Sequence, residues 1–393
     1  AATPFVAILL AIALLPLIHR THHWWEHNRN KLMVSLVLAV IALVYYLLRG
    51  IGLGHGDHAS EPGVPTVLAV LRHSLLDEYI PFMVLLFSLY TVCGGIVLRG
   101  DLRATPAVNT AFLGIGALLA SFVGTTGASM LLIRPLLQTN RERTHRRHTV
   151  IFFIFLVSNV GGCLLPIGDP PLFLGYLKGV PFLWTFTLIK PWAFCIVLLL
   201  IVYYVWDTVA YRREPELQKL LDRQLIEPLS LKGSFNFIWL LGVVGAVATI
   251  CPGEAFFGLF VVPEYFLREA VMLAFVAIAW LMTPRINREH NEFNFVAITE
   301  VAVLFVGIFI TMQVPIEILN EMGSELRLRT PAQVFWATGV LSSFLDNAPT
   351  YVVFFETANA MTRSAGAGVL NLIGGNFIRQ DVLIGISLGA VFM

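Results

Sequence analysis

Apolar residues follow one another along this chain in stretches of about 20, and short charged segments separate the stretches. A stretch of that length can cross a ~30 Å hydrocarbon core as a helix. The pattern starts with AATPFVAILLAIALLPLI at residues 1–18 and continues with Lys31 to Leu48 and Tyr79 to Leu98. We count about ten such elements, which predicts an all-α polytopic membrane protein.

Lysines and arginines gather in a few of the segments between the apolar stretches. Because cytoplasmic loops carry the excess of these residues, this placement assigns the loops to a side of the membrane. The segments with the cytoplasmic composition are His19 to Lys31, Arg99 to Arg103, Arg141 to His148, Asp207 to Lys232 and Pro284 to Glu292. We expect Asp207 to Lys232 to be a solvated linker between two halves of the chain.

The mostly apolar segment Ala104 to Leu137 lies between two of these cytoplasmic loops, so it must return to the side on which it starts. Two arms of about 16 residues, each about 24 Å long, fit this constraint and are short for a full crossing. The centre of the segment reads SFVGTTGAS at 121–129, where glycines disfavour helix and Thr125 and Thr126 bring hydroxyls into an apolar region. We therefore predict a re-entrant helical hairpin with its tip at 121–129.

The next apolar stretch, which starts at Thr149, is predicted to be a broken transmembrane helix. Residues 158–171 read SNVGGCLLPIGDPP, with a glycine pair, several prolines and the carboxylate of Asp169. Proline removes a backbone donor and clashes with the preceding turn, so a continuous α-helix cannot pass through this segment.

The second half of the chain shows a weak echo of the first. LLFSLYTVCGGI at 85–96 resembles VLFVGIFITMQVPI at 303–316, and SFVGTTGA at 121–128 resembles SFLDNAPT at 343–350. Both pairs share an offset of about 220 residues. When the chain is threaded through the membrane according to the charged loops, a second hairpin, Pro331 to Met361, enters from the outside. The halves are then inverted repeats, an architecture that places a transporter's binding site near mid-membrane.

These features divide the chain into five segments. They are 1–74, N-terminal scaffold helices; 75–206, the first inverted repeat, with hairpin tip 121–129 and helix break 158–171; 207–232, the cytoplasmic linker; 233–293, linking helices; and 294–393, the second inverted repeat, with hairpin tip 342–351.

Composition agrees with a membrane protein, because 57% of the residues are hydrophobic and 13% are charged, whereas a soluble domain carries about 25% charged residues. The net charge of +1 and the scattered basic residues indicate no nucleic-acid partner.

The four cysteines have no paired spacing and are expected to be buried free thiols. The first apolar stretch has no charged n-region or cleavage site, which favours a transmembrane helix over a signal peptide.

The helix breaks bring together oxygen atoms of the kind that alkali cations prefer, together with N–H and carbonyl groups that lack helical partners. Three carboxylates, Asp346, Asp169 and Glu300, are candidates for proton or cation coupling, since a carboxylate at membrane depth usually marks an ion path. The candidate ion-binding or substrate-binding side chains are Ser121, Thr125, Thr126, Ser158, Asn159, Ser343, Asn347 and Thr350.

Each candidate also has a structural alternative. The Gly-Thr-Thr-Gly run could allow close packing of helices. Asp346 and Asn347 could form an external loop turn, and Asp169 could cap a helix beside the proline pair. Glu300 could lie near the cytoplasmic interface.

The runs SFVGTTGASMLLIRP, SNVGGCLLPIGDPPLFLGYLKGVPF and SSFLDNAPTY resemble bacterial membrane proteins of the ion transporter superfamily. That superfamily contains NhaD-type sodium/proton antiporters, citrate transporters and arsenite permeases. The resemblance spans roughly residues 75–393 and is most similar to the branch labelled sodium/proton antiporter or citrate transporter.

The resemblance implies two inverted repeats, each with a re-entrant hairpin and a broken helix, in a homodimer in the bacterial inner membrane. It implies that Asp346, Asn347, Thr125, Thr126, Ser158, Asn159 and Asp169 line the ion site. For Na⁺ itself the expected ligands are Asp346, Asn347, Thr125 and Asn159. A second broken helix should follow the second hairpin, so we expect the chain to be a shortened form of a longer protein.

Two functions are consistent with these features. An exchanger of Na⁺ or Li⁺ for H⁺ would use Asp346 to hold either ion in turn. A carboxylate symporter driven by Na⁺ or H⁺ would instead hold a citrate-like anion on hydroxyls, amides and helix N-termini. An enzyme or a channel is less favoured, because the sequence has no pairing of nucleophile with base and no metal triad. We expect no cofactor, with Na⁺ and H⁺ as transported or coupling ions.

Overall fold

The computed structural model describes most of the chain. The described residues are 1–53, 60–224, 226–253, 255–256, 260–263, 265–322, 330–362, 366, 368–373 and 375–393. The chain divides into two compact units, and each is described by itself. The first unit comprises Ala1–Met83, Phe173–Pro181 and Asn294–Met393, and the second unit comprises Val84–Leu172 and Phe182–Phe293.

Within the described residues, six helical segments are long and apolar enough to cross a membrane. They are α3 (Asn28–Leu48), Val64–Cys93, α6 (Pro106–Val123), Arg147–Leu164, Phe182–Arg212 and Val296–Asn320. A seventh span results if α1 (Thr3–Leu14) and α2 (His19–Trp25), which meet at 102°, are counted together. The chain is therefore a helical, multi-pass membrane protein, as the sequence predicts.

The number of spans is smaller than the roughly ten expected from apolar stretches. The difference arises because several apolar helices are shorter than a full crossing, among them α12 (Asn236–Thr249) and α19 (Gln380–Phe392). In addition, the helix expected to begin at Tyr79 begins earlier. It runs from Val64 through a π-helical stretch, His73–Tyr79, to Cys93.

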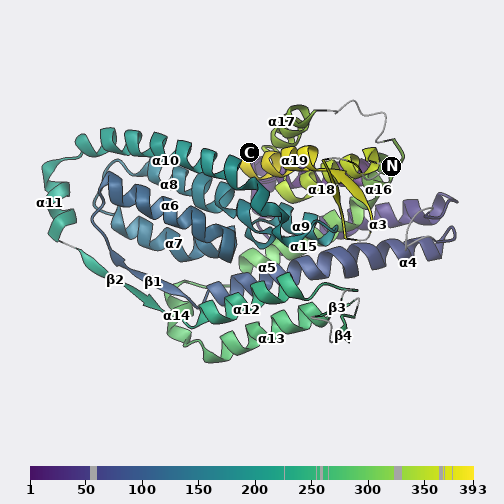
Figure 1. Cartoon of the computed structure of the whole chain (residues 1–393), viewed down its shortest axis with the longest axis horizontal. Helices are drawn as coiled ribbons and strands as arrows, with labels where there is room; N and C mark the ends of the chain where they lie inside the picture. Colours follow the sequence, from purple (N-terminus) through teal and green to yellow (C-terminus); the bar gives the residue numbers. More distant parts are fainter. Residues whose placement is uncertain are drawn as a thin grey trace. The chain divides into compact units, whose positions relative to one another are not determined.

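The first unit is helical apart from one short β-ribbon (Figure 1). Its elements in chain order are α1, α2, α3, α4 (Val64–Arg72), the π-helical stretch, the start of α5 (Ile80–Cys93), the end of α9 (Pro170–Leu177), α15 (Val296–Thr311), α16 (Gln313–Met322), α17 (Pro331–Ser342), α18 (Asn347–Met361), β5 (Val369–Asn371), β6 (Phe377–Arg379) and α19.

Helices α17 and α19 of the first unit approach each other closely. A Cβ atom at Gly389 would lie 2.6 Å from the carbonyl oxygen of Phe335, and one at Gly385 would lie 2.7 Å from that of Pro331. Contacts of this kind between backbones require small residues, which is the usual way in which helices pack inside membranes. The glycines of α19 therefore fix α19 against the first arm of the α17–α18 pair.

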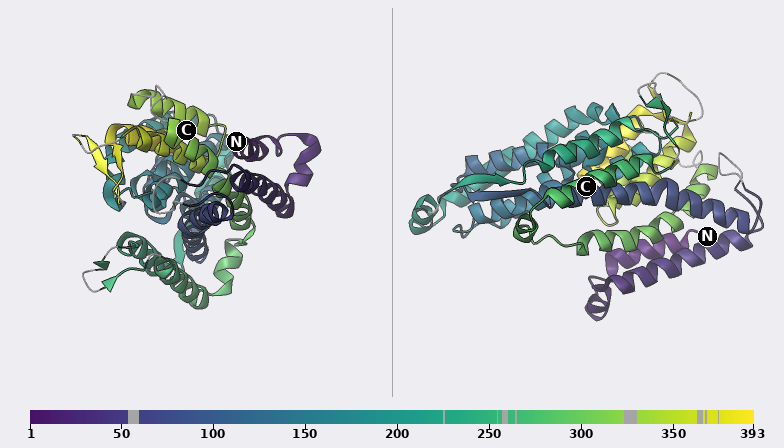
Figure 2. Two further views of the ribbon diagram at one scale, coloured as in Figure 1. Left: turned by 90° about the vertical axis from the view of Figure 1, so that its right-hand side faces the viewer. Right: turned by 90° about the horizontal axis from the view of Figure 1, so that it is seen from below.

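The second unit combines helices with two short ribbons. Its elements are the rest of α5, β1 (Val97–Asp101), α6, α7 (Thr125–Thr139), α8 (Arg147–Phe153), the start of α9, α10 (Ile189–Arg212), α11 (Glu216–Gln224), β2 (Glu227–Lys232), α12, β3 (Ala255–Phe256), β4 (Phe260–Val261), α13 (Leu267–Met282) and α14 (Arg285–His290). Helices α12 and α13 lie side by side in both Figure 1 and Figure 2.

Helices α6 and α7 form a tight helical hairpin within the second unit (Figure 1). One residue, Gly124, separates the end of α6 at Val123 from the start of α7 at Thr125. Its backbone angles, φ +80° and ψ 148°, are essentially restricted to glycine. The pair has the two helical arms and the tip that the sequence predicts. That the hairpin enters and leaves on one side of the membrane stays a prediction, and so do the inverted repeats.

The predicted interruption of the following helix is present. α8 ends at Phe153 and continues as a π-helical stretch, Ile154–Asn159, and then as two short 3₁₀ turns before α9 begins at Pro170. A Cβ at Gly162 would lie 2.6 Å from the carbonyl oxygen of Gly168, so the two 3₁₀ turns pack backbone against backbone. The glycines and prolines thus replace helical hydrogen bonds by a compact irregular segment.

The stretch Asp207 to Lys232, expected to be a solvated linker, is mostly exposed but has regular structure. Helix α10 extends to Arg212, α11 follows it, and β2 pairs with β1 in an antiparallel ribbon. Asp207, Glu214 and Asp222 are buried. Donors of earlier segments bind these carboxylates: the guanidinium of Arg143 contacts Asp207 at 2.6 Å, and the N–H of Ala104 donates to Asp222 at 2.9 Å.

Replacing Gly124 by alanine should destabilise the hairpin. The positive φ disfavours any residue with a Cβ, and we expect a cost of roughly 1–3 kcal/mol. Gly245 in α12 is a matched control, because no atom lies within 4 Å of a Cβ added there. Gly245→Ala should leave the melting temperature of the purified protein unchanged or raise it. Equal melting temperatures for the two variants would contradict this account of Gly124.

Four carboxylates surround the β1–β2 ribbon: Asp101, Glu142, Asp222 and Glu227. Asp101 and Glu227 are directly paired across the ribbon. Burial, followed by the neighbouring carboxylates of Glu142, Asp222 and Glu227, raises the pKa of Asp101 to about 6. The folded chain therefore holds a proton on Asp101 more tightly than the unfolded chain, in which an aspartate titrates near about 3.9.

This shift predicts a pH-dependent effect of Asp101→Asn. The stabilising contribution of protonated Asp101 is fully present below about pH 4 and is lost as the pH rises through about 6. Asp101→Asn should therefore raise the melting temperature above about pH 7 and have little effect near about pH 4. Asp381→Asn, at an exposed carboxylate, provides the baseline. If Asp101→Asn raised the melting temperature equally at both pH values, a raised pKa of Asp101 would be refuted as the cause.

Candidate functional site

The break in the second unit brings three of the predicted side chains together. Thr125 is the first residue of α7, and its Oγ1 donates to Oδ1 of Asp169 at 3.4 Å. Asp169 directly precedes α9, and both side chains are buried. Ser121 lies one turn before the tip, where its hydroxyl donates to the carbonyl oxygen of Gly161 and accepts from the N–H of Leu164. The tip of the α6–α7 pair is thus bonded to the irregular segment.

The other candidates of the second unit are arranged around the same break. The hydroxyls of Ser129 and Ser158 are 2.8 Å apart, which links α7 to the π-helical stretch. Asn159 is the last residue of that stretch, with φ −129° and ψ −89°, and it is half-buried. Thr126 is exposed on the outside of α7. The glycines of the tip also pack closely, because a Cβ at Gly127 would lie 2.6 Å from Sγ of Cys93. Close packing and the contact between Thr125 and Asp169 therefore occur at the same tip.

The tip in the first unit is built around the N-terminus of α18. Asp346 is the N-cap residue, and its Oδ1 accepts from the N–H of Ala348 at 3.0 Å. Thr350 Oγ1 donates to the carbonyl oxygen of Asp346 at 2.9 Å. The hydroxyl of Ser342 lies 2.6 Å from Oδ1 of Asn347. An aspartate at this position satisfies a free N–H group and interacts favourably with the helix dipole.

The remaining candidates in the first unit have structural partners. Ser343 is exposed, and its hydroxyl donates to the carbonyl oxygen of Gly339 at 2.8 Å. Glu300 accepts from Nζ of Lys31 at 2.5 Å, and its own side chain is 44% exposed. This ion pair joins α15 to α3, and a coupling role for Glu300 stays a prediction.

Sequence reasoning missed a cluster of charged residues in the first unit. Nζ of Lys178 lies 2.8 Å from Oε1 of Glu78 and 2.7 Å from Oε1 of Glu356. Nε2 of Gln313 donates to the other oxygen of Glu78 at 2.8 Å. The three charged side chains are at most 12% exposed. Two carboxylates therefore share one ammonium group inside an apolar unit.

A histidine and a further carboxylate flank this Glu–Lys–Glu cluster. His73 places Nε2 3.7 Å from Oε1 of Glu78 and Nδ1 3.1 Å from Oδ2 of Asp77. The formal charges of Glu78, Lys178 and Glu356 sum to minus one, and His73 beside Glu78 is a group that can hold a balancing proton. An uncompensated charge in an apolar interior is costly, so these side chains must be considered together.

The Glu–Lys–Glu cluster was missed because its members are far apart in the sequence. Glu78 lies in the π-helical stretch, Lys178 follows α9, and Glu356 is in α18. Only the fold brings them together. A local signal does exist, since Glu356 stands alone in the run YVVFFETANAM of residues 351–361 and Glu78 falls in the span Val64–Cys93.

Removing the shared ammonium should destabilise the first unit strongly. Lys178→Met leaves Glu78 and Glu356 without a positive partner, which typically costs about 3–5 kcal/mol for a buried pair. Adding Glu356→Gln to Lys178→Met should restore part of the loss in melting temperature. Lys219→Met, which removes a pair with the exposed Glu216, is the control and should cost less than about 1 kcal/mol. Similar losses for the two lysine variants would exclude the buried-pair explanation.

The family described as "Putative citrate transport" matches residues 1–393. No curated protein matches the chain.

Proposed function

We propose, from the premise that this chain belongs to the family described as putative citrate transport, that it exchanges Na⁺ or Li⁺ for H⁺. Membership of a transporter family agrees with the expectation that the chain is not an enzyme. The proposed setting is the bacterial inner membrane, with a homodimer working by alternating access and no cofactor.

The excess of buried carboxylates is the observation that carries this proposal. In the first unit, Glu78 and Glu356 share the single ammonium of Lys178. In the part of the chain that the structure describes, Asp346 forms no ion pair and is held by the N–H of Ala348. Fixed negative charge of this kind attracts a cation and repels a carboxylate substrate.

A single acid at a helix end suffices for exchange. Asp346 would hold a proton in one state and Na⁺ or Li⁺ in another, with the oxygen of Asn347 as a neutral ligand of the metal ion. The second unit has hard oxygen donors of its own, because the hydroxyl of Thr125 donates to the carboxylate of Asp169 at 3.4 Å. Each of these groups is a hard oxygen donor, which suits alkali cations better than soft metals.

Carboxylate symport is the second candidate, and the description of the family favours it. A bound Na⁺ or proton would neutralise Asp346 and so remove the repulsion of a citrate-like anion. The hydroxyls of Ser343 and Thr350 and the N-terminus of α18 would then contact the anion.

Transport by the purified protein in liposomes that contain a pH dye distinguishes these functions. We expect pulses of Na⁺ or Li⁺ to move protons with no carboxylate present. A strict requirement for citrate or a similar acid would refute exchange and support symport. Absence of both activities, in protein that melts cooperatively, would refute both functions.

Asp346→Asn should reduce cation-dependent proton flux by more than about tenfold. The reason is that loss of a hydrogen-bonded charge removes about 1.5–3 kcal/mol of ion binding. Asp381→Asn, at an exposed aspartate that pairs with Arg379, should retain the wild-type flux. Retention of the wild-type flux by Asp346→Asn would show that Asp346 is not the coupling acid.

A further inference from the structure

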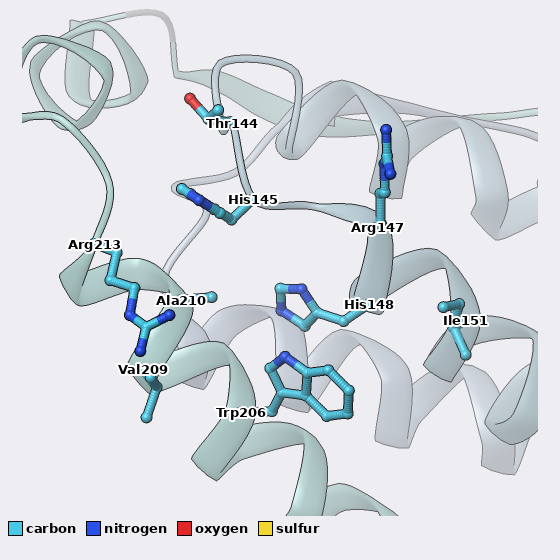
Figure 3. Close-up of a pocket in the computed structure, with 9 residues that line it drawn as sticks. All are labelled: Thr144, His145, Arg147, His148, Ile151, Trp206, Val209, Ala210 and Arg213. Atoms are coloured by element: carbon cyan, nitrogen blue, oxygen red, sulfur yellow. The ribbon is translucent and has the colours of Figure 1, made fainter.

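A cavity lies at one end of α10, in the second unit. It has a volume of about 470 Å³ and is formed by the loop before α8, by α8 itself and by the last turns of α10. Ligand pockets in proteins typically measure about 300–1,000 Å³. Figure 3 shows the side chains of Arg147 and Arg213 on either side of the stacked rings of His148 and Trp206.

The arginines of this cavity are available to an anion. Arg147 and Arg213 are both exposed, and within the described residues neither forms an ion pair. Two neighbouring carboxylates are already engaged. Asp207 is bound by Arg143 at 2.6 Å and by Nε2 of His148 at 2.8 Å.

Glu214 is the second neighbouring carboxylate, and it too is satisfied within the protein. It accepts from the backbone N–H of His145 at 2.7 Å and from that of Thr144 at 3.1 Å. Burial raises the pKa of Glu214, but these two hydrogen bonds and the charge of Arg143 outweigh burial and leave the pKa below its ordinary value. Glu214 is thus charged and is hydrogen-bonded within the protein, and it does not neutralise Arg147 or Arg213.

The other wall of the cavity is apolar and open. Ile151 is 49% exposed, Trp206 is 56% exposed and Val209 is 45% exposed. The same side of the molecule continues along α10, where large apolar residues such as Val205 and Leu198 are exposed as well. Because α10 belongs to a candidate membrane span, exposed apolar side chains at these positions are suited to contact with lipid chains.

A tryptophan between charged and apolar surfaces is typical of the membrane interface. The two segments that provide the arginines, Arg141 to His148 and Asp207 to Lys232, carry the basic excess typical of the cytoplasmic side. Anionic phospholipids give the cytoplasmic leaflet its negative charge, and basic pockets between helices on that side bind their headgroups.

We infer that this cavity binds an anionic phospholipid, with the negative headgroup attracted by the exposed guanidinium groups of Arg147 and Arg213 and an acyl chain along Trp206, Val209 and the exposed side of α10. A free phosphate ion would use the arginines alone. The open apolar wall therefore favours the lipid as the source of the phosphate. This inference does not depend on which ion or carboxylate the protein transports.

The first test measures lipid retention. The full-length protein is exposed to an equimolar mixture of phosphatidylcholine and phosphatidylglycerol, and the retained lipid is identified by native mass spectrometry. We expect wild type to retain phosphatidylglycerol preferentially and Arg147→Gln/Arg213→Gln to retain roughly tenfold less. Arg146→Gln/Arg212→Gln is the matched control, because it changes the adjacent residues and the same net charge outside the cavity.

Three results of this test would overturn the inference. They are equal retention by wild type and Arg147→Gln/Arg213→Gln, an equal loss in the control variant, and displacement of the lipid by inorganic phosphate at low concentration. The last result would identify a site for free anions.

A second test does not require the arginine variants to fold. Phosphatidylglycerol with brominated acyl chains should quench the fluorescence of wild type more than brominated phosphatidylcholine does, and the difference should disappear in Trp206→Phe. Equal quenching by the two lipids, or an unchanged difference in Trp206→Phe, would contradict the proposed site.

Discussion

A charge that leaves water for an apolar interior must be met by an opposite charge or by hydrogen bonds, and this constraint organises both units. In the first unit Lys178 joins Glu78 to Glu356 and so connects three segments that are far apart in the sequence. In the second unit Arg143 and His148 hold Asp207 at the end of α10. Such pairs add little net stability over apolar packing, but breaking one leaves an uncompensated buried charge. They therefore fix which segments lie together.

Interrupted helices impose the complementary constraint on the backbone. Where α8 gives way to π-helical and 3₁₀ turns, donors and acceptors lose their regular partners and must find others. The hydroxyl of Ser121 donates to one carbonyl and accepts from one N–H of the irregular segment, and the hydroxyl of Thr125 donates to Asp169. Polar side chains that look anomalous in an apolar sequence are thus the partners of an irregular backbone. The same oxygens are the ones a cation could use.

The parts of the structure that depend on local pattern were predictable. The turn at Gly124 and the break at 158–171 follow from glycine and proline in apolar stretches, and the structure has both. Contacts between distant segments were not predictable. Nothing in the local sequence pairs Lys178 with Glu78 and Glu356, and the charged stretch after Asp207 resembles a solvated loop until Arg143 is placed beside it. For the same reason the ion pair of Glu300 with Lys31 could not be read from the sequence.

Helix α18 links the two acidic features of the first unit. Asp346 caps its N-terminus, and Glu356 lies about ten residues along it, which is about 15 Å at 1.5 Å per residue. At an effective dielectric constant of about 20, two unit charges at that separation interact by about 1 kcal/mol. Tyr351 and Phe355 are buried between them, so little water screens the pair. In the proposed exchanger, a cation or proton gained at Asp346 would therefore weaken cation binding near Glu356 by somewhat less than tenfold. A transporter that must release one ion when it takes up another can use a coupling of this sign, and a single rigid helix is enough to provide it.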